Sequence, residues 1–148
     1  MMMHELATYA SEGPASVDVE IDRPQIDGPE AAFEQLRHLQ EFDRECCMAL
    51  MLDTKHRLIR REVVSLGSID HTFMSAREIY RDALLAGAAA IVLAHNHPSG
   101  DHQPSNDDEL VTRRLAKAGE LIGIELLDHL VLGQDDSWTS MARKGHLP

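Results

Sequence analysis

The run AAAIVLA at residues 88–94 is the feature that most restricts the fold of this 148-residue chain. Its seven apolar residues, between Gly87 and His95, fall well short of the roughly 20 that a membrane span needs. A short, continuous apolar run of this kind is typical of a strand that is buried on both faces. It therefore predicts a buried strand, with a polar segment that begins at its carboxyl end.

The segments around this strand supply the other elements of such a domain. The periodicity predicts helices over residues 29–42, 75–87 and 106–121, and strands over residues 46–53, 56–67, 88–94 and 124–133. Ser75 and Glu78 form an expected capping box at the start of the second helix, and Gly123 is expected to end the third. The expected fold is an α/β domain with helices flanking a mixed sheet.

Length and composition indicate one domain with an N-terminal tail. A chain of 148 residues can bury one sizeable core but divides poorly into two domains. Residues 1–28 are rich in Ser, Gly, Pro and Asp and show little periodicity, apart from the alternation VDVEI at 17–21, a candidate edge strand. We therefore expect a flexible tail over residues 1–28 and the domain itself over residues 29–148.

Charge and the N-terminal residues bear on partners and location. The 14 Lys and Arg against 25 Asp and Glu give a formal net charge of -11, which repels polyanions and disfavours direct binding to nucleic acid. No segment resembles a membrane span or a secretory signal, so a cytoplasmic location is expected. Cys46 and Cys47 are adjacent in an apolar run and are expected to be small core residues rather than a disulfide.

The segment HNHPSGDHQPSNDD follows the central strand and concentrates polar side chains. If the strand continues, His95 and His97 project from the same face, which suits two ligands of one cation such as zinc. A turn after His97 lets the chain fold back, so Asp108 at the next helix start could supply a third ligand. Ser105 and Asp108 also fit an ordinary capping box, and a lone His-x-His is more often a surface pair. The combination favours a metal site.

The spacing His-x-His, seven residues, Ser, two residues, Asp matches the JAMM motif of the JAB/MPN metalloprotease family, and HNHPSGDHQPS resembles its RadC branch. The resemblance covers about residues 29–140, including REIYRDALLAGAAAIVLAHNHPSG and LLDHLVLG. It implies a three-layer α/β/α fold of cytidine-deaminase-like shape. It also implies that His95, His97 and Asp108 are the ligands of Zn²⁺. Ser105 matches the serine that helps to hold the reacting oxygen.

The resemblance also implies a catalytic base. Family members use a glutamate at an upstream helix-to-strand junction, and Glu45, just before CCMALMLD, has that place. Spacing alone does not select it over three other acids, Glu41, Asp43 and Glu62. By this resemblance zinc lowers the pKa of its water to about 7, and Glu45 accepts the proton. Ser105 would stabilise the oxyanion, and Glu45 would protonate the leaving amine. The implied reaction is hydrolysis of a peptide or isopeptide bond.

Two other histidines have weaker claims to the site. His129, in LLDHLVLG, resembles a RadC position, but on an apolar strand it is expected to be a hydrogen-bonded core histidine. His102 stands where RadC relatives carry a proline or small residue, and it is either an exposed bystander or an adventitious ligand. Asp107, next to Asp108, is an alternative third ligand, although the spacing of the motif favours Asp108.

The sequence also bears on functions other than hydrolysis. A deaminase is excluded because its Pro-Cys-x-x-Cys and His-x-Glu motifs do not occur. One alternative is a non-catalytic MPN-like interaction module. Another is a DNA repair protein homologue with an accessory role in DNA repair. Longer RadC relatives have, in front of this domain, a region that resembles a helix-hairpin-helix DNA-binding region. We expect no room for such a region here. The intact motif favours a catalyst, and the substrate is not identified.

Overall fold

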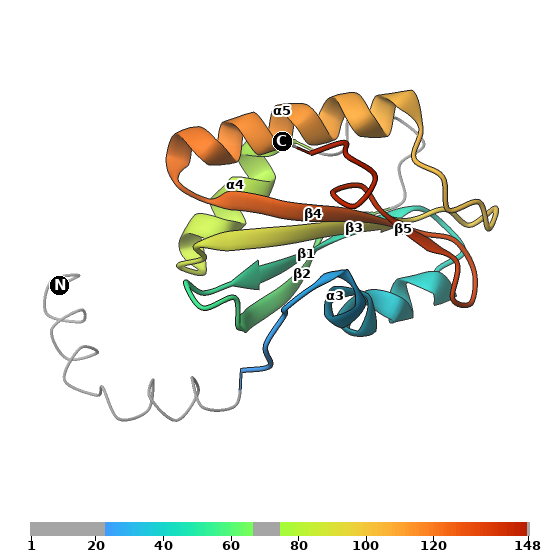
Figure 1. The fold of residues 1–148 in the computed structure, drawn as a ribbon, viewed down its shortest axis with the longest axis horizontal. Helices are drawn as coiled ribbons and strands as arrows, with labels where there is room; N and C mark the ends of the chain where they lie inside the picture. The colour runs from blue at the N-terminus through green and yellow to red at the C-terminus, as the bar shows by residue number, and fades with distance from the viewer. Residues whose placement is uncertain (1–22, 67–74, 148) are drawn as a thin grey trace, which may run out of the picture.

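The computed structural model of the chain describes residues 23–66 and 75–147. The elements, of which Figure 1 labels all but η1, are α3 (Pro29–Leu36), η1, a 3-10 helix (Arg37–Glu41), β1 (Cys46–Leu52), β2 (Leu58–Leu66), α4 (Ala76–Leu85), β3 (Ala90–Asn96), α5 (Asn106–Ile122), β4 (Glu125–Leu132) and β5 (Trp138–Ser140). No helix in these described ranges is long and apolar enough to cross a membrane.

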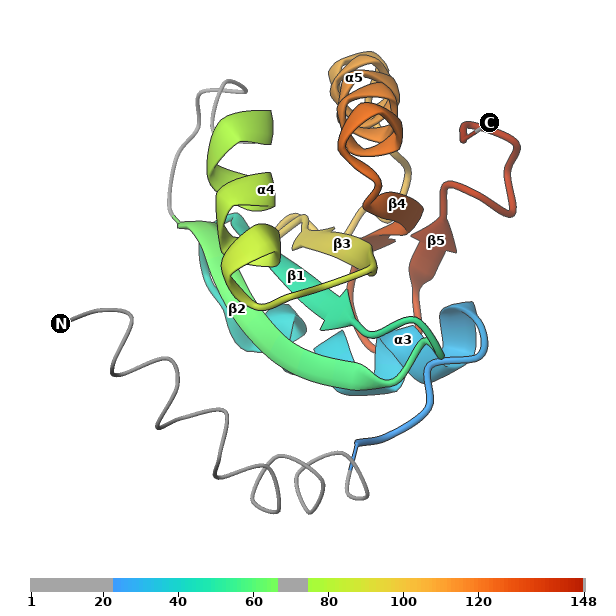
Figure 2. The ribbon, with the colours of Figure 1, turned by 90° about the vertical axis from the view of Figure 1, so that its left-hand side faces the viewer.

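The strands form one five-stranded mixed sheet in the order β2-β1-β3-β4-β5. β3 is central, antiparallel to β1 and parallel to β4, and the crossover from β3 to β4 is made by α5. Figure 2 shows α4 and α5 on one face of the sheet and α3 on the other. The expected three-layer α/β/α fold with a mixed sheet is confirmed.

Alternation along the central strands divides the core into two clusters. Every residue of β1 and β3 is buried, as their apolar runs predict. Successive side chains point to opposite faces, so Ala94 packs in the cluster beneath α3, whereas Leu93 packs beneath α4 and α5. At the end of β3 the same alternation places His95 toward the α5 face and Asn96 toward the α3 face.

Several local features differ from the sequence-based expectations. The helix expected over residues 29–42 is interrupted, because α3 ends at Leu36 and continues as the tighter η1. Ser75 is the N-cap residue of α4, but its side chain makes no capping hydrogen bond, so the expected capping box there is wrong. The short strand β5 was not expected, and the candidate edge strand at 17–21 lies outside the described residues.

The described chain makes backbone contacts before α3 begins. The N–H of Ile26 donates to the carbonyl of His56 at 2.9 Å, and the N–H of Leu58 donates to the carbonyl of Pro24 at 2.8 Å. Ile26 is buried in the α3-side core. The segment that enters α3 is thus fixed against the turn between β1 and β2, whereas residues 1–22 of the expected tail lie outside the described residues.

Candidate metal centre

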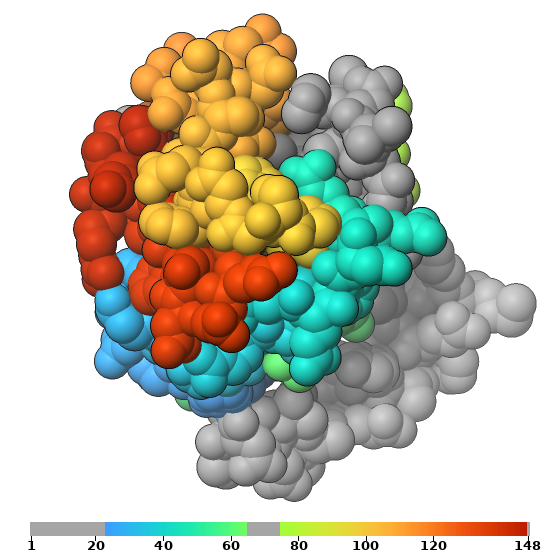
Figure 3. Space-filling model, turned by 90° about the vertical axis from the view of Figure 1, so that its right-hand side faces the viewer, coloured from blue at the N-terminus to red at the C-terminus, as the bar shows by residue number. Residues whose placement is uncertain are grey.

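The polar loop leaves the sheet at the carboxyl end of β3. The strand continues through His95 and Asn96, and the N–H of His97 still donates to the carbonyl of Leu132 on β4 at 2.8 Å. In Figure 3 the yellow loop after β3 borders both the cyan segment before β1 and the orange-red turn after β4. The extended backbone at residues 95–97 gives the two histidines the same-face arrangement that their spacing predicts.

Four side chains from separate parts of the chain meet at this point. The Nε2 atoms of His95 and His97 are 3.0 Å apart. Oδ2 of Asp108, in the first turn of α5, lies 3.3 Å from Nε2 of His95 and 3.6 Å from Nε2 of His97. Oε1 of Glu45 approaches Nε2 of His97 at 3.8 Å. Glu45, His95 and His97 offer ligand atoms that all lie within 4.8 Å of one another, so this group could hold a metal ion.

The separations between these atoms fit a tetrahedral ion. Zinc bonds of about 2.0–2.2 Å place tetrahedral ligand atoms about 3.3–3.6 Å apart. The distances among His95 Nε2, His97 Nε2 and Asp108 Oδ2 are 3.0, 3.3 and 3.6 Å, within a few tenths of an ångström of that range. Two imidazoles and a carboxylate are also donors that zinc accepts. The residues present therefore fit a zinc ion.

A backbone contact fixes the proton of His97. Its Nδ1 lies 2.7 Å from the carbonyl oxygen of Asp101, which can only accept a hydrogen bond. Nδ1 of His97 therefore carries the hydrogen and donates it, which leaves the lone pair of the neutral ring on Nε2. That nitrogen is the one that faces His95 and Asp108, as a metal ligand must.

Ser105 and Asp108 form a capping box and also reach the histidines. The N–H of Asp108 donates to Oγ of Ser105 at 3.0 Å, and the N–H of Ser105 donates to Oδ2 of Asp108 at 2.8 Å. The same Oδ2 faces His95, so the structural and the metal-binding interpretations of the pair are compatible. Oγ of Ser105 accepts in the cap, and the hydroxyl hydrogen of this exposed residue still has freedom to donate.

Charge at the centre is balanced between acid and histidine. Burial opposes ionisation of Asp108, but the imidazoles of His95 and His97, which can donate to the carboxylate when they are protonated, outweigh burial and hold its pKa well below the usual range. The hydrogen bond to Asp108 in turn raises the pKa of His97. The two shifts have one cause: an ionised carboxylate favours positive charge among these imidazoles, which is the environment a cation needs.

The carboxylate of Glu45 lies at the more open side of the centre. Its side chain is 21 % exposed and that of His97 is 18 % exposed, whereas Asp108 and His95 are 7 % and 0 % exposed. Among the acids that spacing could not separate, Glu41 and Asp43 are exposed, and Glu62 pairs with an arginine of its own strand. In the described part of the chain, Glu45 is the one of these four that lies within 4 Å of His97.

Comparison with known proteins adds a family. A family model described as the RadC-like JAB domain matches residues 26–146. The chain belongs to this family. A UPF0758 protein of Desulforamulus reducens is 43 % identical over 110 residues, which are 74 % of this chain and 48 % of the relative.

Further members of the family resemble this RadC-like JAB domain to a similar degree. A UPF0758 protein of Halalkalibacterium halodurans is 42 % identical over 133 residues, or 87 % of this chain and 56 % of the relative. One of Haemophilus influenzae is 46 % identical over 104 residues, or 70 % of this chain and 47 % of the relative. The chain thus spans about half the length of the curated relatives that it matches.

Two histidines of this RadC-like JAB domain support the centre from outside it. His129 on β4 is fully buried, and its Nε2 lies 2.7 Å from Nδ1 of His95, so it is a hydrogen-bonded core histidine as expected. Burial keeps the pKa of His129 well below its usual value. His102 is not an exposed bystander, because its Nδ1 bonds Oγ1 of Thr139 on β5 at 2.8 Å and ties the loop to the sheet.

Asn96 is a supporting residue of the RadC-like JAB domain that the sequence pattern did not single out. Asn96 is buried between the two histidines, and its side chain points to the opposite face. Its Oδ1 accepts from the N–H of Cys46 at 2.7 Å, and its Nδ2 donates to the carbonyl of Arg44 at 3.0 Å. These bonds hold the backbone on both sides of Glu45. The alternation of β3 predicts that the side chain of Asn96 points to the face opposite the histidines, but it does not predict which groups the side chain contacts.

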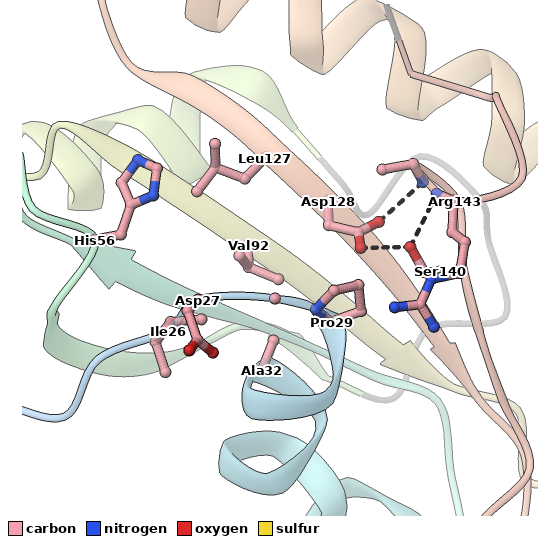
Figure 4. A pocket seen from close by; sticks show the side chains of 12 residues that line it. Ile26, Asp27, Pro29, Ala32, His56, Val92, Leu127, Asp128, Ser140 and Arg143 are labelled. Carbon is pink, nitrogen blue, oxygen red and sulfur yellow. Dashed lines mark hydrogen bonds between the residues drawn. The ribbon is translucent and has the colours of Figure 1, made fainter.

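A hollow of about 380 Å³ lies elsewhere, on the α3 face of the sheet (Figure 4). It is lined by Ile26, Asp27, Gly28, Pro29, Ala32, His56, Val92, Leu127, Asp128, Ser140, Ala142 and Arg143. Its buried carboxylate, Asp128, accepts hydrogen bonds from Oγ of Ser140 at 2.5 Å and from the N–H of Ala142 at 3.0 Å. None of the four side chains at the histidine centre lines this hollow, so it is separate from that centre.

Proposed function

We propose that this RadC-like JAB domain is a zinc-dependent metallohydrolase that cleaves a peptide or isopeptide bond. The observation that carries the proposal is the approach of His95 Nε2, His97 Nε2 and Asp108 Oδ2 to within 3.0–3.6 Å of one another. These three residues would hold the ion. Bound there, zinc supplies Lewis-acid chemistry, which lowers the pKa of water to about 7 and polarises a carbonyl group.

Two carboxylates approach the histidines, and we assign them different roles. Oδ2 of Asp108 is 3.3 and 3.6 Å from the two Nε2 atoms, which matches the edge of a tetrahedral site. Oε1 of Glu45 is 3.8 Å from the nearer Nε2, beyond that edge and on the exposed side. Asp108 is therefore the proposed ligand, and Glu45 is the proposed general base.

Glu45 would move the protons of the reaction. A carboxylate beside the attacking water accepts its proton as the bond to the carbonyl carbon forms, and then donates that proton to the nitrogen of the leaving amine. The C–N bond breaks at this second step, and the carboxylate is regenerated. The partial exposure of Glu45 supports this role, because substrate and water must reach it.

Ser105 would stabilise the charge that develops on the substrate. Its Oγ is fixed by the N–H of Asp108 at 3.0 Å, next to the proposed ligands. Because the hydroxyl accepts in this bond, its hydrogen is able to donate to the carbonyl oxygen as that oxygen becomes negative. The helix cap would thus hold an oxyanion donor in place before the substrate arrives.

Metal content and hydrolysis together test the proposal. Purified protein should contain zinc by elemental analysis, and it should cleave at least one member of a panel of peptides and isopeptide-linked conjugates. Glu45→Gln should keep its zinc and lose about 10²–10⁴-fold in rate, as expected for removal of a general base. Glu41→Gln, which changes an exposed acid of η1, is the matched control and should keep both zinc and rate.

Other outcomes would move the assignment. Full activity in Glu45→Gln would place the base elsewhere. A wild-type protein that binds no zinc, and whose stability a chelator leaves unchanged, would contradict the metallohydrolase and favour a non-catalytic interaction module. Such a module remains compatible with an accessory role in DNA repair. Direct contact with nucleic acid is disfavoured in either case by the net charge of -11.

A further inference from the structure

A buried relay of side-chain contacts, made by His95, His129, Thr112 and Met141, runs away from the metal centre into the core. Nδ1 of His95 lies 2.7 Å from Nε2 of His129, and Nδ1 of His129 lies 2.6 Å from Oγ1 of Thr112. The hydroxyl of Thr112 donates to Sδ of Met141 at 3.6 Å. All four residues are 0 % exposed. The relay joins β3, β4, α5 and the segment after β5.

The direction of these hydrogen bonds follows from the last contact of the relay, between Thr112 and Met141. The hydroxyl of Thr112 donates to Sδ of Met141, and on this basis we assign Oγ1 as the acceptor of a hydrogen bond from Nδ1–H of His129. The neutral ring of His129 then has its lone pair on Nε2, which accepts from Nδ1–H of His95. Nε2 of His95 is left without a hydrogen, and it is the atom 3.3 Å from Asp108.

We infer that His129 is a positioning residue of the metal centre. Supported by Thr112, it fixes the tautomer and the ring orientation of His95 so that Nε2 faces His97 and Asp108. This inference rests on the proposed function, because it concerns the ligand geometry of the same site. Metal-binding histidines generally donate their other ring N–H to a partner that orients them, commonly a carboxylate or a carbonyl. Here an imidazole has that position.

Helix α5 couples this support to the third proposed ligand. Thr112 follows Asp108 by four residues, so the two side chains lie on the same face, one turn apart. Both are buried, and both point toward the sheet, one at the metal centre and the other at His129. A shift of α5 would therefore disturb the carboxylate and the orientation of His95 together.

Zinc affinity in matched variants tests the inference. His129→Phe keeps a ring of similar size and removes the acceptor, and it should lower zinc affinity, measured by chelator competition, about 10–100-fold. His129→Gln restores an acceptor oxygen and should recover most of the loss. Tyr80→Phe is the control, because it deletes a buried hydroxyl bonded to the carbonyl of Leu115 at 2.5 Å, away from the relay. It should cost stability and leave zinc affinity unchanged.

The ring protons give a second readout that a purely structural role would not move. Long-range proton–nitrogen NMR of the zinc-loaded wild type should show hydrogen on Nδ1 of His95 and on Nδ1 of His129. The reverse assignment for His129, with hydrogen on Nε2, would overturn the inference. So would wild-type zinc affinity in His129→Phe, and the proposed hydrolase would then still stand.

Two further results are distinguishable. A wild-type protein without zinc affinity would overturn both this inference and the proposed function. If His129→Phe fails to fold, Thr112→Val takes its place, because it keeps the side-chain shape and leaves Nδ1 of His129 without its acceptor. Weaker zinc binding in Thr112→Val than in Tyr80→Phe supports the relay, and equal binding in the two variants contradicts it.

Discussion

Asn96 and Cys46 are joined by a 2.7 Å hydrogen bond from the backbone N–H of Cys46 to the side-chain Oδ1 of Asn96. The Nδ2 of Asn96 also donates to the carbonyl of Arg44, so the amide spans Glu45 between its two neighbours. His95 and His97 face the metal centre, whereas Asn96 points to the other side of the sheet. One tripeptide thus contributes two proposed ligands and the anchor of the proposed base.

Asn96→Ala should destabilise the fold. The change leaves the N–H of Cys46 and the carbonyl of Arg44 without this buried partner, and an unsatisfied buried group costs about 1–3 kcal/mol. Urea denaturation should show a loss of that size in the free energy of unfolding. Asn96→Asp keeps an acceptor oxygen for the N–H of Cys46 but sets a buried carboxylate oxygen against the carbonyl of Arg44, so it should also destabilise the fold. A change below about 0.5 kcal/mol for Asn96→Ala, the usual range of surface substitutions, would show that the bond contributes little.

Gly133→Ala should displace the loop that carries His97. A Cβ at position 133 would collide with the carbonyl oxygen of Gly100 and press on His102, so the loop and the turn after β4 have to separate. Overpacking of this kind costs about 1–3 kcal/mol. We expect lower stability together with weaker zinc binding.

Gly123→Ala is the control for Gly133→Ala. Gly123 has φ +81° at the end of α5, and its Cβ would meet open space, so the change strains the backbone without touching the loop. Both variants should be less stable, but only Gly133→Ala should weaken zinc binding. Equal zinc affinity in the two variants would contradict the role of this close approach.

The sequence predicted the elements that have strong periodicity. The apolar run at 88–94 gave β3, and the polar-to-apolar pattern from Asn106 gave α5 with Gly123 at its end. His95, His97 and Asp108 could be grouped because they lie within fourteen residues and follow one strand, one turn and one helix start. β5 escaped notice because three residues carry no usable alternation.

The contacts that support the centre could not be predicted in the same way. Asn96 meets Cys46, and His129 meets His95, through the register of β3 against β1 and β4, including a register shift at Ile91/Val92. A single sequence specifies which face a strand residue occupies but leaves its cross-strand neighbour open. For the same reason the place of Glu45 came from the family resemblance rather than from spacing.

Ser105→Ala should have two separable effects. Loss of the N-cap oxygen should reduce the free energy of unfolding by about 0.5–2 kcal/mol, because the N–H of Asp108 loses its acceptor. Loss of the proposed oxyanion donor should lower the rate of amide hydrolysis about 10²–10³-fold at saturating substrate. Ser105→Thr keeps a hydroxyl and should retain most of both. If Ser105→Ala loses stability but keeps its rate, the serine is only a helix cap.

Asp53 should make stability depend on pH in acid. Burial raises its pKa, but hydrogen bonds from the N–H groups of Arg57 and Lys55 and from the Arg57 guanidinium outweigh burial, so the net pKa is lowered. A lowered folded-state pKa contributes stability above the unfolded value of about 3.9, and that contribution is lost as pH falls through the folded pKa. Asp53→Asn should therefore flatten the acid side of a stability–pH curve from urea denaturation.

Asp136→Asn is the control for this pH effect. Asp136 pairs with Arg37, but its side chain is 89 % exposed, so its contribution should be small. The curve of Asp136→Asn should follow that of the wild type. An unchanged acid slope in Asp53→Asn would show that the turn does not depend on this charge.

The two carboxylates at the centre can be told apart by zinc-dependent stability. Asp108→Asn keeps an oxygen that can accept from the N–H of Ser105, so the start of α5 should survive, but it removes the charge that faces the histidines. At free zinc about 100-fold above the dissociation constant, binding should stabilise the wild type by about 2.7 kcal/mol. Glu45→Gln should keep this gain if Glu45 is a base, and Asp108→Asn should lose most of it. Thermal unfolding with and without a chelator measures both, and the opposite ranking would make Glu45, rather than Asp108, the carboxylate ligand beside His95 and His97.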